Sequence, residues 1–185
     1  WYRSDNSWDL SPGFERLDHP PGFFREVESG CLFCHTNPPD TLEGGHARFQ
    51  KLPATGFSCA RCHGDGRAHT EGQLAGKKTP ILSPDSMPAA ESADVCAQCH
   101  MEGAARVLRA GRSWSDYVPG EKLSDTVALF ERQRPSEGFG SVDHATRLAQ
   151  SACAKGSKRF NCATCHSPHG DRDEDRSASC RKCHG

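Results

Sequence analysis

The sequence Cys31-Leu-Phe-Cys34-His35 decides how the rest of this chain is interpreted, because its pattern, Cys-x-x-Cys-His, occurs five times. The other copies are Cys59-Ala-Arg-Cys62-His63, Cys96-Ala-Gln-Cys99-His100, Cys162-Ala-Thr-Cys165-His166 and Cys180-Arg-Lys-Cys183-His184. This pattern is the attachment signature of c-type haem. Two thiols three positions apart add across the two vinyl groups of one porphyrin, and the adjacent histidine becomes the proximal ligand of the iron. The sequence therefore predicts five covalently bound haems.

Other cysteine chemistries account for the pattern less well. A zinc site also uses Cys-x-x-Cys pairs, but it needs two converging pairs and no histidine directly after each pair. A thioredoxin-like redox motif occurs once, inside a βαβ pattern. Disulfides would place no constraint on the residue that follows. The histidine after each of the five pairs favours haem.

The composition indicates that this chain cannot build an ordinary hydrophobic core. Leu, Ile, Val and Phe make up 27 of the 185 residues, which is below the roughly 20% at which chains tend to be disordered. The net charge of -1 argues against disorder. Five large apolar porphyrins would replace the missing core. We expect a mainly α fold with much irregular loop, haems forming the core, and little or no sheet.

The histidines match the irons in number. Of the ten, five belong to the motifs, and the other five are His19, His46, His69, His144 and His169. If each of these supplies a sixth ligand, every haem is bis-histidine and closed, so that it passes electrons but binds no substrate at iron. His19, which precedes Pro20-Pro21, is the weakest of the five candidates. Met87 is a weaker one still.

Two of these histidines lie close to a motif. His69 is six residues after His63, and His169 is three residues after His166. Since the motif histidine holds the opposite face of its own haem, we expect each to ligate a neighbouring haem.

The eleventh cysteine, Cys153, lies outside the motifs. An inert, partly buried thiol is favoured, with an iron ligand, an extra porphyrin link or an intermolecular disulfide as alternatives.

The haems divide one pentahaem domain, residues 1–185, unevenly. Three are attached within 31–100 and two within 162–184, and the stretch 101–161 has none. We predict a helix at about 142–152, short helices at the motifs (for example Ala93–His100) and a further helix at 101–110. Leu123–Phe130 is ambiguous between helix and strand. Asp171–Arg176 is expected to be a solvated loop.

Several stretches, taken together, resemble a known family. They are Ser7–Phe14, Cys31–Asn37, Cys59–His69, Cys96–His100, Pro119–Asp125, and Arg147–Cys153 leading to Cys162–His169. The chain resembles multihaem c-type cytochromes related to cytochrome c554 and hydroxylamine oxidoreductase, and within that group those often fused to tetratricopeptide repeats. The resemblance implies closely packed bis-histidine haems, a helix-and-loop fold, and His69 and His169 as sixth ligands to other haems. Cys153 lies where such cytochromes often have a cysteine.

The chain also departs from this family. A further haem motif near the start and repeats after the last haem are absent, so this sequence is expected to be a segment of a longer protein, in which one of its histidines could serve a haem outside it. The opening at Trp1 has the alternative explanation that a signal has been removed. A lysine-ligated variant of the motif, as in nitrite-reductase active sites, is also absent.

These features favour electron transfer as the function. The expected partners are other redox proteins or copies of the chain in a conductive filament. The alternative is a haem enzyme acting on a small nitrogen or sulfur compound at one open iron, which requires that one extra histidine is not a ligand. Covalent haem attachment predicts a periplasmic or extracellular location. The sequence pI of about 6.8 gives no basic footprint for nucleic acid, and no apolar run is long enough for a transmembrane segment.

Overall fold

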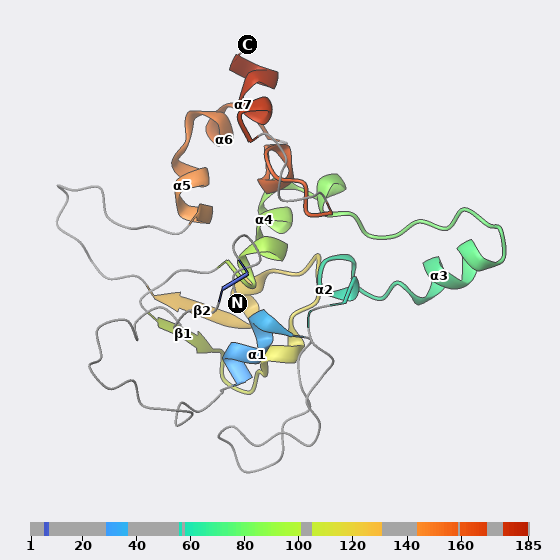
Figure 1. Ribbon diagram of the computed structural model, residues 1–185. Helices are drawn as coiled ribbons and strands as arrows, with labels where there is room; N and C mark the ends of the chain where they lie inside the picture. Colours follow the sequence, from blue (N-terminus) through green and yellow to red (C-terminus); the bar gives the residue numbers. More distant parts are fainter. Residues whose placement is uncertain are drawn as a thin grey trace.

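The computed structural model describes residues 6–7, 29–36, 56, 58–100, 105–130, 144–158, 160–169 and 176–184. Short helices predominate among them (Figure 1). The α-helices are α1 Ser29–His35, α2 Ala60–His63, α3 Arg67–Leu74, α4 Ala89–Ala97, α5 His144–Gln150, α6 Ala152–Gly156 and α7 Arg176–His184. Single 3-10 turns are η1 Pro84–Ser86, η2 Trp114–Asp116, η3 Leu123–Asp125 and η4 Cys162–Thr164.

A two-stranded antiparallel sheet is the one departure from helices and loops in the described part. Strand β1, Ala105–Leu108, pairs with β2, Val127–Phe130, with Leu108 opposite Val127. The predicted helix at 101–110 is therefore wrong over the residues described, and the ambiguous stretch Leu123–Phe130 resolves into η3 followed by a strand. Burial is confined to the end of the sheet where Leu108 pairs with Val127: Val127 is buried and Leu108 partly buried, whereas Phe130 at the other end is exposed.

The core lies beside this sheet and is small. Phe33, Tyr117, Leu123 and Val127 form one buried cluster, against which Cys34, Ala97, Leu108 and Trp114 pack. Phe33 and Trp114 hold α1 against η2, with ring centres 5.1 Å apart. The cluster thus joins the first haem motif to the segment 105–130, which carries no motif.

Helix α4 presents one face to this core. Pro88 precedes its first residue, Glu91 lies in its first turn, and the α-helix ends at Ala97, followed by turns through His100. Ser92, Val95 and Gln98 are buried, at a spacing of three that places them along one side of the helix. The predicted helix over Ala93–His100 overlaps α4 only at residues 93–97, because α4 begins four residues earlier and ends three residues before His100.

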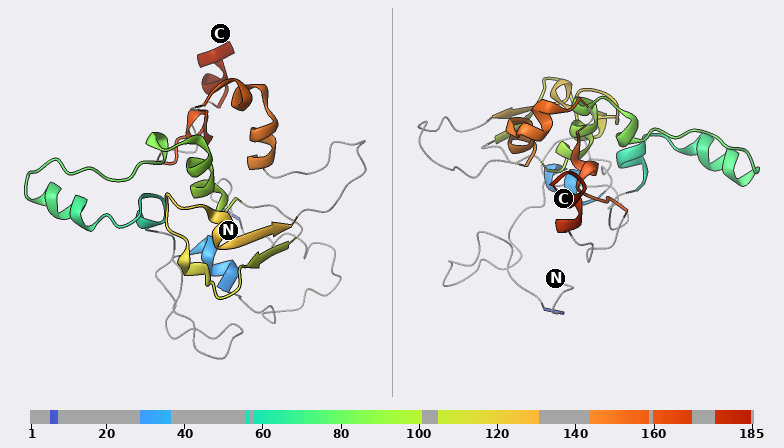
Figure 2. Two further views of the ribbon diagram at one scale, coloured as in Figure 1. Left: turned by 180° about the vertical axis from the view of Figure 1, so that it is seen from behind. Right: turned by 90° about the horizontal axis from the view of Figure 1, so that it is seen from above.

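Two regions extend from this core. Helix α3 and its flanking loops project to one side as an arm, visible in all three views, while α5, α6 and α7 lie at the end opposite the sheet (Figures 1 and 2). The predicted helix at 142–152 is confirmed over α5 and is interrupted at Ser151, whose hydroxyl accepts a hydrogen bond from the Ala154 N–H and so caps α6. Of the expected loop at 171–176, only Arg176 lies within the described residues, and it begins α7.

The described helices are short. The longest, α4 and α7, have nine residues each, whereas a helix needs about 20 to cross a bilayer. In this part of the chain no candidate for a membrane-spanning helix is present.

Candidate haem attachment sites

All five Cys-x-x-Cys-His motifs fold as a helical turn. Motifs one and five lie within α1 and α7, and motif two ends α2. In motifs two, three and four, the histidine N–H donates to the carbonyl of the first cysteine at 2.9, 3.0 and 2.9 Å. In such a turn, residues i, i+3 and i+4 share one face. Each motif therefore presents both thiols and the imidazole to the same side, as attachment of one flat ligand requires.

The second variable residues of the first three motifs meet in a buried junction. They are Phe33, Arg61 and Gln98, with 0%, 8% and 2% of their surface exposed. The Arg61 guanidinium donates to the Phe33 carbonyl at 2.7 Å and lies 4.2 Å from the centre of the Phe33 ring. The Gln98 amide donates to the Arg61 carbonyl at 2.8 Å and to the Val95 carbonyl at 2.7 Å. These bonds fix motifs one, two and three relative to one another.

Thiols of different motifs also approach one another. Cys34 and Cys99 share a hydrogen bond that, against the effect of burial and with help from Arg106, lowers the pKa of the Cys34 thiol to about 6. The same bond, together with burial, raises the pKa of Cys99. A bond with Cys162, followed by burial, raises the pKa of Cys96. Motif three is therefore adjacent to motif one on one side and to motif four on the other.

Two of the candidate ligand histidines are anchored through Nδ1. His63 Nδ1 lies 2.6 Å from the Leu82 carbonyl oxygen, and His69 Nδ1 lies 2.7 Å from that of Thr79. The Thr79 hydroxyl donates a hydrogen bond to the His69 carbonyl oxygen at 3.0 Å. A carbonyl accepts only from a protonated nitrogen, so this contact places the proton on Nδ1 and leaves Nε2 as the lone-pair donor. Both rings are oriented as metal-ligating histidines usually are.

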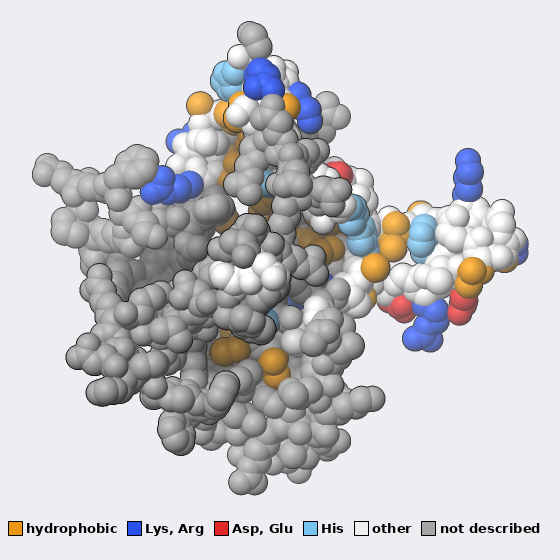
Figure 3. Space-filling view, in the orientation of Figure 1, with side chains coloured by type: hydrophobic (Ala, Val, Ile, Leu, Met, Phe, Trp, Pro, Cys, Tyr) orange, Lys and Arg blue, Asp and Glu red, His pale blue; other side chains and the backbone are white. Residues whose placement is uncertain are grey.

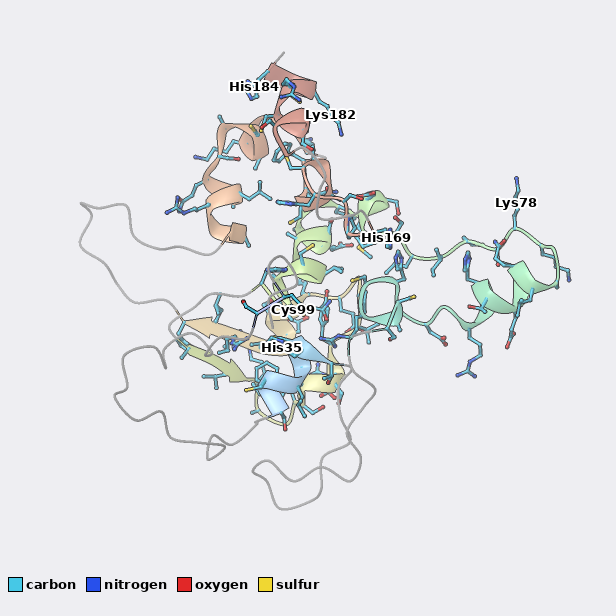
Figure 4. All side chains as sticks on the ribbon, in the orientation of Figure 1. His35, Lys78, Cys99, His169, Lys182 and His184 are labelled. Atoms are coloured by element: carbon cyan, nitrogen blue, oxygen red, sulfur yellow. The ribbon has the colours of Figure 1, made fainter. Side chains whose placement is uncertain are left out.

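One pair of histidines comes together from distant parts of the sequence. The rings of His63 and His169 lie with their centres 5.8 Å apart and their planes 9° from parallel. Figure 4 labels His169 near α4 and the base of the arm. In Figure 3, histidine and hydrophobic side chains lie side by side on the surface where the arm leaves the body.

The structure describes only some of the remaining histidines that were predicted to be iron ligands. His35, His100, His166 and His184 are exposed at the ends of their turns. His144 begins α5, but its side chain, like the whole of His19 and His46, lies outside the described residues. Among the described histidines, His63 and His169 are the pair whose rings lie nearly parallel and close together.

Cys153 differs from its expected environment. It lies in α6 and is exposed, so the expected partial burial of this thiol is wrong. Helix α6 packs against α5, but Cys153 lies on a part of α6 that the described residues leave exposed. No disulfide joins any of the eleven cysteines.

Sequence reasoning missed three residues that shape this site: Arg61, Gln98 and Tyr117. Arg61 and Gln98 are polar residues at variable positions of a motif, and the motif pattern itself assigns no role to these positions. Tyr117 is 5% exposed, and its Oη and Gln98 Oε1 are buried without a hydrogen-bond partner among the described atoms. Burial, then the charges of Asp94, Cys96 and Cys62, raises the pKa of Tyr117, which places the phenol near thiols of motifs two and three.

The residues present fit haem. Paired thiols and a histidine share one face at each motif, and an unsatisfied phenol beside two of the motifs could donate to a carboxylate such as those that haem carries. In the described residues, no three His, Cys, Asp or Glu side chains converge on one point. A haem iron does not require such a group, because the porphyrin supplies four of its ligands and the protein at most two.

No family model, curated protein or solved structure matches this chain.

Proposed function

We propose that this chain is an electron-transfer protein that carries five c-type haems. The single observation that supports this most directly is the shared helical turn of all five motifs, which presents two thiols and an imidazole on one face. When bound, haem supplies an iron that alternates between the ferrous and ferric states. The chain's own residues attach, ligate and space these groups.

Each residue type has a defined role in this proposal. The cysteines Cys31, Cys34, Cys59, Cys62, Cys96, Cys99, Cys162, Cys165, Cys180 and Cys183 attach the porphyrins. In each attachment the sulfur bonds to one vinyl carbon and the thiol hydrogen goes to the other, so no oxidant is needed. His35, His63, His100, His166 and His184 are the proximal ligands, and His19, His46, His69, His144 and His169 are the candidate sixth ligands.

Contacts between motifs support transfer along the chain. Arg61 and Gln98 hold motifs one to three together, and Cys96 meets Cys162 of motif four. Electron transfer slows steeply with distance, so groups attached at adjoining turns exchange electrons faster than groups held apart. Donor and acceptor would be other redox proteins, or further copies of the chain in an extracellular filament. Covalent haem is assembled on exported protein, so the proposed location is periplasmic or extracellular.

A haem count and a carbon monoxide titration test this proposal. The purified chain is expected to contain five haems, to show a low-spin spectrum when reduced, and to leave that spectrum unchanged when carbon monoxide is added. Its midpoint potentials should lie below those of a histidine/methionine cytochrome, because a methionine ligand raises the potential. A chain with no covalent haem would refute the proposal. A spectral change equivalent to one haem would instead favour the second candidate, an enzyme acting on a small nitrogen or sulfur compound at an open iron.

A further inference from the structure

The His63–His169 pair joins the two groups of motifs. His63 ends α2, in the part of the chain that carries motifs one to three. His169 follows motif four, beyond the stretch 101–161 that carries no motif. Their rings are nevertheless 5.8 Å apart and 9° from parallel. A contact between segments so distant in sequence needs a reason, because two imidazoles at this separation gain little from each other directly.

The separation matches that of two axial ligands. Imidazole nitrogens bind a metal at about 2 Å, so two rings on opposite sides of one ion have centres roughly 6 Å apart. Fully overlapped rings would have centres about 3.5–4.0 Å apart, and offset-stacked rings about 4.5–7 Å apart, so the inference rests on this separation together with the orientation of His63. The Leu82 carbonyl, 2.6 Å from His63 Nδ1, leaves Nε2 of His63 as the ligating atom.

The nearest alternative partner for His169 is the haem of its own motif. There the His166 N–H is bonded to the Cys162 carbonyl, and His166 occupies the proximal position of that turn. Three residues cannot carry the chain around a porphyrin edge to the opposite face, so an iron ligated by His169 would belong to a different haem. Among the described residues, the histidine ring paired with it is that of His63.

We infer that His169 is the sixth ligand of the haem attached at Cys59 and Cys62, on the face opposite His63. The inference rests on the proposed function and deepens it. It makes the haems of motifs two and four neighbours, since His169 is three residues from His166. Electrons could then cross between the two groups of haems without passing along the stretch 101–161.

A double-variant comparison tests this assignment on the full haem-loaded chain. The number of haems that bind carbon monoxide is counted, relative to total haem, in wild type, His63→Ala, His169→Ala and the double variant. His169→Ala alone is expected to open one haem. Added to His63→Ala, it should open no further haem, because both residues then act on the same iron. This result holds whether or not His63→Ala retains its haem, since a lost haem cannot be opened either.

A matched pair of variants provides the control. Combined with His184→Ala, which lies in motif five, His169→Ala should open one haem more than His184→Ala does alone. Imidazole added to the His169→Gly variant should restore the low-spin spectrum, which shows that only a ligand was lost and the fold retained. An extra open haem in the His63→Ala background would overturn the assignment, and so would a His169→Ala variant with every haem closed. Either result leaves a wild-type count of five haems, and hence the proposed function, intact.

Discussion

Arg61 shows how a variable residue within a haem motif acquires a role. Its side chain is almost completely buried, yet it carries a permanent charge. That charge is satisfied by the Phe33 carbonyl and ring and lies near the thiols of Cys62 and Cys99. A buried cation close to three attachment sites favours the reduced state of a nearby iron, which carries one positive charge less. In the proposed haem-loaded chain, this residue is therefore expected to act on the midpoint potential as well as on packing.

Replacing this charge is expected to lower a midpoint potential. An interaction of about 1 kcal/mol corresponds to roughly 40 mV for a one-electron couple. In Arg61→Gln, we expect at least one of the five haems to titrate lower by an amount on the order of tens of millivolts, with the haem count unchanged. Arg61→Lys keeps the charge but loses the planar fork, so it should retain the potential and lower the melting temperature.

Lys182 provides the matched control for this substitution. It occupies the same second variable position, in motif five, and is exposed, and Figure 4 shows it on α7 at the far end of the molecule. Lys182→Gln removes one positive charge, as Arg61→Gln does, but from a solvent-exposed position. It should therefore shift the midpoint potentials little. If both variants titrate like wild type and only Arg61→Gln loses thermal stability, the role of Arg61 is structural alone.

At the scale of elements, local pattern predicted helices better than strands. The turns at the motifs follow from a short-range signal, the Cys-x-x-Cys-His spacing, and α5 lies where the local pattern predicted a helix, whereas the break at Ser151 was not predicted. Strand β1 could not be predicted in this way, because Ala105–Leu108 is stabilised by Val127–Phe130, which lies across a long connection. The His63–His169 pair has the same origin, since contacts between distant segments leave no periodic trace in a sequence. The cysteines and histidines of the motifs were predicted from the sequence. The buried contacts among Phe33, Arg61 and Gln98, which join three motifs, were not.

Helix α3 and its return loop form a unit that holds His69. Gly72 is buried, and a Cβ at this position would overlap the Thr79 side chain. Thr79 in turn holds the His69 ring and carbonyl through two hydrogen bonds. The absence of a side chain at Gly72 therefore lets the loop lie close enough to fix a candidate ligand.

Gly72→Ala should displace Thr79 and release His69. Overpacking of this kind costs about 1–3 kcal/mol. If His69 is a sixth ligand, a fraction of one haem equivalent is expected to bind carbon monoxide in the variant, with the haem count preserved. Gln73→Ala, at the next and exposed position of α3, is the control and should leave all haems closed. Identical spectra for both variants would show that this anchor does not position an iron ligand.

At the scale of the whole molecule, the chain alone has little to hold it together. Six large hydrophobic side chains are buried among the described residues, and six others, Leu74, Leu82, Val107, Val118, Leu129 and Phe130, are exposed. Elements such as α3 have almost no buried surface beyond Gly72. Small domains that bury too little apolar surface are usually stabilised by additional groups, such as disulfides or bound metals.

Removing the haems is therefore expected to remove the fold. A variant in which the ten motif cysteines are replaced by alanine cannot attach haem, and we expect its circular dichroism to change gradually on heating, without a cooperative transition. The loaded chain should melt cooperatively. Cys180→Ala with Cys183→Ala, which removes only the fifth haem, should keep that transition at a lower temperature, because the core at Phe33 and Arg61 retains its neighbours. A cooperative transition in the haem-free chain would mean that Phe33, Tyr117, Leu123 and Val127 form a sufficient core, and that the haems are added to a fold which already exists.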